Sequence, residues 1–209
     1  MATASGAADR RRTRAVMLEL YPRRCSNAGS TAIRTLSMRR LPAAPEVFVD
    51  GEWSQRVAAI QAGVRPLRFL AGTWTGEGTS EGEPVRGRLV ASLVLDDTFL
   101  ECSEQLFTAT GELDHEDRVV YRYDIENQTL RALHLQAPGW VTERHVDLLS
   151  EGTGFVWSGG PTLPRVVVRQ LDAQEVQVEV WLPGEATATT RMLYRREDGH
   201  LGAPPAHPG

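Results

Sequence analysis

The chain has 209 residues and a formal net charge of −4, and all 23 of its basic residues are arginine. This length fits one ordinary domain with a tail and excludes a large multidomain enzyme. No run of eighteen apolar residues occurs, which excludes a transmembrane helix. The two cysteines, Cys25 and Cys102, are too few and too far apart for a disulfide framework or a thiolate zinc site.

Charge is unevenly distributed along the chain. Residues 1–45 hold nine arginines and two acids, a charge of +7, which leaves −11 on residues 46–209. An acidic body argues against nucleic-acid binding, because neutralising phosphates needs clustered cations. The basic segment is predicted to be a disordered leader, or an extension upstream of a true start at Met17 or Met38. An organellar transit peptide is the alternative interpretation of this segment. A secretory signal is not expected, because the segment lacks the apolar core that such a signal needs. We therefore expect a cytoplasmic protein.

Residues 46–70 are predicted to be a short helical lead-in. Arg56–Ala62 consists of good helix formers, and Gly63 is expected to end this helix. Pro66 begins a second short helical turn with an apolar face.

From Gly72 onward the pattern changes to period 2. Val119, Tyr121 and Tyr123, for example, share one face of a predicted strand. Nine turn signals separate ten such segments, which predicts an antiparallel sheet of ten strands. The turns lie at residues 81–84, 96–97, 110–112, 126–127, 138–139, 151–154, 159–161, 172–173 and 183–184.

The edge strands of a ten-stranded sheet have unpaired backbone groups that need a partner or a cover. The short connections favour an all-β, up-and-down barrel over a sandwich. The barrel domain is predicted over residues 71–196, and a Gly/Pro-rich disordered tail over residues 197–209. A barrel of about ten strands is too wide for side chains alone to fill, so we expect a ligand cavity.

Gly72, Trp74, Gly76 and Gly78 form the pattern G-x-W-x-G-x-G after a short apolar helix. This pattern resembles the opening of the nitrobindin-like and fatty-acid-binding-like barrels of the calycin (lipocalin-like) group. It is most similar to an uncharacterised bacterial lipocalin-like branch. The resemblance covers roughly residues 64–196 and implies a ten-stranded antiparallel β-barrel.

In the nitrobindin branch, the resemblance would imply a haem with a histidine ligand on a strand near the C-terminal end. The last two predicted strands, Gln174–Leu182 and Ala186–Arg196, contain no histidine. The nearest are His200 and His207, in the predicted tail. We therefore expect no haem, no haem-dependent nitric oxide chemistry and no other cofactor.

Trp74 has two interpretations. The resemblance implies that it packs across the closed end of the barrel and meets an arginine of the last strand, and Arg191, Arg195 and Arg196 are available. A guanidinium over an indole contributes roughly 0.5–2 kcal/mol. The alternative is that Trp74 contacts a ligand.

Glu104 shares a strand face with Leu100, Cys102 and Leu106. If that face lines the cavity, Glu104 is a buried carboxylate with a raised pKa, suited to acid–base work or to orienting a ligand. Cys102 would then be a small core residue. Tyr121 and Tyr123 are predicted to line the cavity wall.

Two candidates lie on strands for which the sequence does not decide which face points inward. His134 shares one face with Leu130, Ala132 and Gln136, so it lies in the interior only if that face does. Arg191 lies opposite Met192 and Tyr194 on the last strand, and one of these two sets must point inward.

No metal site is predicted. Glu143, His145 and Asp147 share one strand face, but its ends are ~13 Å apart, too far for one ion, so a solvent face is expected. Residues 114–117, Asp-His-Glu-Asp, are interpreted as a solvated acidic turn.

The favoured function is binding of a small hydrophobic or amphipathic molecule in the barrel. No nucleophile elbow, zinc-protease motif or phosphate-binding loop occurs. The first alternative is an enzyme, either a cofactor-free isomerase or cyclase using Glu104, Tyr121 or His134, or a haem protein with an unusual ligand. The second is a filled barrel that acts as an interaction module.

Overall fold

The structure is a computed structural model that describes residues 50–137 and 139–197. The predicted leader at residues 1–45 lies outside the described residues, as does the predicted tail apart from Glu197. Among the described residues, no helix combines the length and the apolar character needed to span a membrane.

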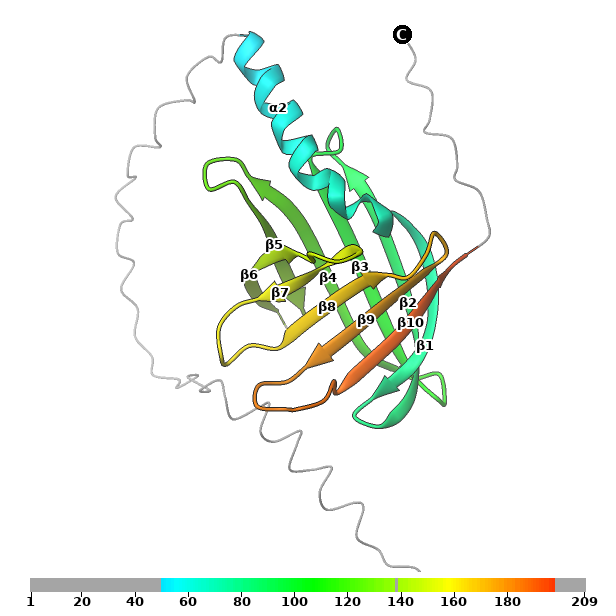
Figure 1. Cartoon of the computed structure of the whole chain (residues 1–209). Helices are drawn as coiled ribbons and strands as arrows, with labels where there is room; N and C mark the ends of the chain where they lie inside the picture. Colours follow the sequence, from blue (N-terminus) through cyan, green and yellow to red (C-terminus); the bar gives the residue numbers. More distant parts are fainter. Residues whose placement is uncertain (1–49, 138, 198–209) are drawn as a thin grey trace, which may run out of the picture. The chain divides into compact units, whose positions relative to one another are not determined.

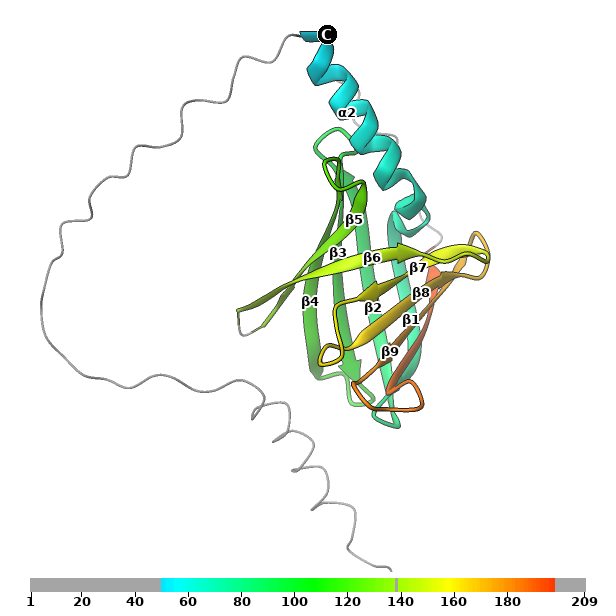
Figure 2. The ribbon, with the colours of Figure 1, turned by 60° about the vertical axis from the view of Figure 1, so that its left-hand side comes forward.

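Ten antiparallel strands form a closed barrel, in which each strand pairs with the next and β1 pairs with β10 (Figure 1). The predicted up-and-down barrel is thus confirmed. Figure 2 shows consecutive strands lying side by side around the wall. The strands are β1 (Gly72–Ser80), β2 (Glu83–Val94), β3 (Phe99–Thr108), β4 (Leu113–Asp124), β5 (Thr129–Gln136), β6 (Trp140–Leu148), β7 (Thr153–Ser158), β8 (Arg165–Gln170), β9 (Glu175–Trp181) and β10 (Thr190–Arg196).

Successive side chains of each strand point alternately into and out of the barrel, and this alternation decides which side chains face the interior. Leu100 and Cys102 on β3 pair with Tyr121 and Val119 on β4, and all four are buried. Because every pairing is antiparallel and nearly in register, the apolar faces of all ten strands meet inside the barrel.

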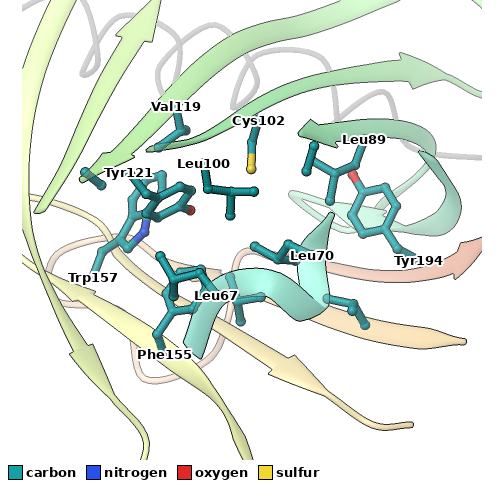
Figure 3. Close-up of a cluster of buried hydrophobic side chains, with 14 of the residues drawn as sticks. Leu67, Leu70, Leu89, Leu100, Cys102, Val119, Tyr121, Phe155, Trp157 and Tyr194 are labelled. Atoms are coloured by element: carbon teal, nitrogen blue, oxygen red, sulfur yellow. The ribbon is translucent and has the colours of Figure 1, made fainter. Parts of the chain in front are cut away.

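A helical segment enters one end of the barrel. Helix α2 (Asp50–Val64) leads into the 3-10 helix η1 (Arg65–Leu70). Pro66 is the second residue of η1. Leu67 and Leu70 are 0% and 3% exposed. Figure 3 shows both leucines projecting from η1 among barrel side chains such as Phe155.

Helix α2 ends at Val64, one residue beyond the predicted stop at Gly63. Gly63 lies where the ring of Tyr123 packs against the helix. A Cβ atom at this position would lie 2.1 Å from Cγ of Tyr123, closer than any real contact. Gln61 adds a hydrogen bond from its Nε2 to the Asp96 carbonyl oxygen at 2.6 Å.

Trp74 and Arg196 join η1 to the first and last strands. The Trp74 Nε1–H donates to the Leu70 carbonyl oxygen at 2.7 Å, and the Arg196 guanidinium lies 4.1 Å from the centre of the indole. Arg196 Nη1 and Nη2 donate to the carbonyl oxygens of Ala71, at 2.6 Å, and Phe69, at 3.0 Å. The C-terminal carbonyls of η1, which have no helical partners, are therefore satisfied by side chains from β1 and β10.

We expect Arg196→Ala to lower the free energy of unfolding by about 3 kcal/mol, because two charge-assisted hydrogen bonds and a cation–π contact are lost. Urea titration of both proteins measures the change. Arg195→Ala is the matched control, since Arg195 has a side chain 69% exposed and pairs with Glu175 on the outer surface. The control should cost less than about 1 kcal/mol. Equal losses in the two variants would contradict this account of the barrel end.

Candidate functional site

The interior of the barrel has an apolar half and a polar half. The half that receives η1 is lined by Leu100, Tyr121 and Phe155 together with Leu67 and Leu70. Further along the same strands, away from η1, polar side chains face inward. We call these residues the polar cluster: Glu104, His115, Asp117, His134, Thr142 and Tyr194.

Asp117 is the centre of the polar cluster. Its Oδ2 atom lies 2.7 Å from Nε2 of His134 and 3.2 Å from Nε2 of His115. The side chains of Asp117 and His134 are only 10% and 8% exposed, whereas that of His115 is 38% exposed. The two imidazoles therefore both donate an Nε2 proton to one buried carboxylate.

The histidines keep Asp117 ionised. Burial opposes the charged form, but the hydrogen bonds from His115 and His134 outweigh it and hold the pKa of Asp117 below its ordinary value. The same hydrogen bond raises the pKa of His115, against the effect of partial burial. A negative charge is thus fixed inside the barrel, with the half-exposed His115 beside it.

Glu104 lies directly opposite Asp117 on the neighbouring strand and accepts a hydrogen bond from the Tyr194 hydroxyl. Burial, with the Asp117 charge as the second cause, raises the pKa of Glu104 to about 7. The hydrogen bond from Tyr194 acts in the opposite direction. The cluster therefore pairs an ionised carboxylate with a neighbouring carboxyl group that titrates close to neutral pH.

Two glycines on adjacent strands leave space for the Tyr194 ring. Gly76 on β1 pairs with Gly87 on β2 and with Tyr194 on β10. A Cβ at Gly87 would lie 2.4 Å from the Tyr194 hydroxyl oxygen, and one at Gly76 would lie 2.6 Å from the ring. The close approach that these glycines permit is what lets Tyr194 reach Glu104.

The structure brings two of the six predicted site residues, Glu104 and His134, into the polar cluster. Tyr121 is buried in the apolar half, with its ring 5.3 Å from that of Phe155, and burial raises the pKa of its phenol well above the ordinary value. Tyr123 packs on the helix at Gly63. Cys102 is a free, buried core residue, as predicted.

Trp74 and Arg191 lie away from the cluster. Trp74 is completely buried at the η1 end, where Arg196 is the arginine that covers it. Arg191 points outward, with a side chain 58% exposed and its Nε 3.3 Å from Glu179 on the outer face. Met192 and Tyr194 occupy the inward face of β10 instead.

The prediction of a solvated acidic turn over residues 114–117 is wrong. These residues belong to β4, which begins at Leu113, and His115 and Asp117 face inward. The signal was present in the sequence, because the apolar face of β4 extends backward by steps of two from Val119 to Asp117 and His115. A charged side chain at an inward position of a strand interrupts the apolar alternation, so the apolar pattern alone indicates this strand only from Val119 onward.

The predicted solvent face of β6 is confirmed. Glu143 and Asp147 are exposed, and His145 bonds to Asp147 with 2.9 Å between Nε2 and Oδ1. In the described part of the chain, no group of three or more histidine, cysteine or acidic side chains is placed to hold a metal ion.

The positions of the histidines do not fit the haem site that the resemblance implies. Strands β9 and β10 contain no histidine. His134 lies on β5, and its Nε2 is already bonded to Asp117.

No family model matches the chain, and no curated protein matches its sequence. Among solved structures, the barrel is similar to the crystal structure of Rv2717c from M. tuberculosis, with a TM-score of 0.50 and 14% sequence identity. The match covers 65% of this chain and 97% of that chain. At this identity the likeness shows the fold alone.

Glu104→Gln is expected to change how stability depends on pH. The folded-state pKa of Glu104, about 7, lies above the unfolded value, so protonation of Glu104 stabilises the folded state. This stabilisation is complete below about pH 4.5. This contribution is lost as the pH rises from about 5 to 7. The free energy of unfolding of the wild type, relative to the variant, should fall by roughly 3 kcal/mol over this range.

Denaturant titrations at pH 5 and pH 8 measure this difference. Glu101→Gln is the control for the loss of one negative charge, because Glu101 lies on the outer face of the same strand and pairs with Arg118. A gap between wild type and Glu104→Gln that stays constant with pH would show that Glu104 does not titrate inside the barrel.

Proposed function

We propose that the barrel reversibly binds a small amphipathic molecule whose polar end meets the polar cluster. The observation that carries the proposal is a pair of buried polar atoms on neighbouring strands. His134 Nδ1 and Thr142 Oγ1 are both inaccessible to solvent and have no hydrogen-bond partner among the described residues. Buried polar atoms in folded proteins are nearly always satisfied, and leaving one unsatisfied costs about 1–3 kcal/mol. A bound polar group would remove that cost.

Apolar side chains around the cluster support the amphipathic class of ligand. The Trp157 ring lies 5.1 Å from the His134 ring. Val166 and Val178 face inward on β8 and β9 and are only partly buried. A ligand with an apolar body would contact these side chains and bury their remaining surface. The resemblance of the G-x-W-x-G-x-G segment to calycin-like barrels supports the same function, which requires no cofactor.

Native mass spectrometry of the protein as purified tests the proposal. We expect a mass excess that disappears on denaturation and identifies the ligand. His134→Leu should reduce the fraction of protein that carries it by at least fivefold, because the polar end loses its partner. His145→Leu is the matched control, since His145 lies on the outer face of the adjacent strand, and it should leave that fraction unchanged. A bare mass, together with no binding of the fluorescent probe 1-anilinonaphthalene-8-sulfonate, would contradict the proposal.

A second candidate, a cofactor-free isomerase, is favoured by the pKa of Glu104 and by the Asp117–His134 pair. One group that titrates near 7 beside one imidazole suits proton transfer between two carbons of a substrate. The two functions differ in what happens to the ligand. Incubated in deuterium oxide with the protein, the ligand recovered from purification would incorporate deuterium at carbon if the protein is an isomerase, and would return unchanged from a binding protein.

A further inference from the structure

The polar cluster contains a feature that narrows the chemical class of the ligand, and this inference rests on the proposed function. His134 and Thr142 are directly opposite each other on β5 and β6. Opposite residues of an antiparallel pair have Cβ atoms about 4.5–5.5 Å apart. At this spacing one oxygen atom can bond both unpartnered atoms, Nδ1 and Oγ1, and the inference uses this arrangement.

The network around Asp117 fixes what each of these atoms can do. His134 Nε2 lies 2.7 Å from the Asp117 carboxylate and therefore carries the proton. In the neutral imidazole, Nδ1 is then a hydrogen-bond acceptor with a free lone pair. Since Asp117 stays ionised and is only 10% exposed, it holds the imidazole in this tautomer and orientation. Thr142 Oγ1 can donate or accept.

We infer that this position binds a hydroxyl group of the ligand. The hydroxyl proton would be donated to His134 Nδ1, and the hydroxyl oxygen would accept the proton of Thr142 Oγ1. A ligand hydroxyl is the simplest group that satisfies both atoms at once. A carbonyl or ether oxygen would leave His134 Nδ1 without a donor, and an apolar group would leave both atoms unsatisfied.

The surroundings restrict the hydroxyl further. The face of the Trp157 ring, whose centre lies 5.1 Å from that of the His134 ring, provides an apolar surface beside the hydroxyl, while its buried Nε1–H is a polar group with no hydrogen-bond partner among the described residues. Trp157 is itself 6% exposed and lies 6.1 Å from the buried Tyr121 ring. An aromatic or unsaturated alcohol would place its ring against Trp157 while its hydroxyl reaches His134. The ligand class is thus an alcohol or phenol with a compact apolar body.

Phenol and toluene test this inference directly, because they have nearly the same size and differ in the hydroxyl group. We expect phenol to bind the full-length protein at least tenfold more tightly than toluene, measured by isothermal titration calorimetry. A site built to bond a hydroxyl discriminates strongly against an analogue that lacks it. Phenol, and not toluene, should shift the Nδ1 resonance of His134 in a long-range proton–nitrogen NMR spectrum.

Two variants assign the discrimination to the proposed pair. Thr142→Val keeps the shape of the side chain and removes only the hydroxyl, so it should weaken phenol about fivefold and leave toluene unchanged. His134→Leu should abolish the preference for phenol. The control His145→Leu, on the outer face, should keep the full preference. If His134→Leu fails to fold, the near-isosteric variant Thr142→Val alone tests the inference.

Each other outcome overturns the inference in a distinguishable way. If toluene binds as tightly as phenol, or if neither variant reduces the preference, an apolar ligand site remains and the hydroxyl assignment is wrong. If neither compound binds and the His134 resonance does not move, a water molecule alone satisfies the two atoms. Native mass spectrometry then decides separately whether the barrel carries another ligand.

Discussion

The contact between Trp74 and Arg196 is the constraint on which the rest of the structure depends. It joins the first strand, the last strand and the carbonyl oxygens at the end of η1 in one set of hydrogen bonds and one ring contact. Because η1 is held there, Leu67 and Leu70 fill one half of the interior with apolar side chains. The polar cluster lies further along the same strands, beyond these apolar side chains.

A polar cluster inside a barrel is costly unless its members bond to one another. Asp117 meets this requirement by accepting hydrogen bonds from two histidines. Glu104, whose one hydrogen-bond partner among the described side chains is Tyr194, meets it by holding its proton up to about pH 7. The atoms that the cluster leaves without partners, His134 Nδ1 and Thr142 Oγ1, are where the protein can still gain from a bound molecule. The same geometry that limits the cost of burial thus supports a binding site.

The sequence predicted the fold well and the site in part. Short, regularly spaced turns and period-2 strands were enough for the ten-stranded barrel, and the first-strand tryptophan was expected to meet an arginine of the last strand. Glu104 and His134 were recognised as candidates, but the inward face of β5 could not be assigned from one strand, because Leu133 and Leu135 on its other face are equally apolar. Asp117 was missed because acidic residues near a turn normally face solvent. Only the register with β3 and β5, which no single strand encodes, places it between Glu104 and the histidines.

The central claim is that Asp117 fixes the proton of His134 on Nε2, so that Nδ1 faces the interior as an acceptor. A long-range proton–nitrogen NMR spectrum of the protein labelled with nitrogen-15 in histidine measures this tautomer directly. At pH 8 the account predicts a protonated Nε2 and an unprotonated Nδ1 for His134, and a loss of that preference in Asp117→Asn. A protonated Nδ1, or an averaged signal typical of an exposed imidazole, would contradict the proposed geometry of the site and the ligand chemistry derived from it.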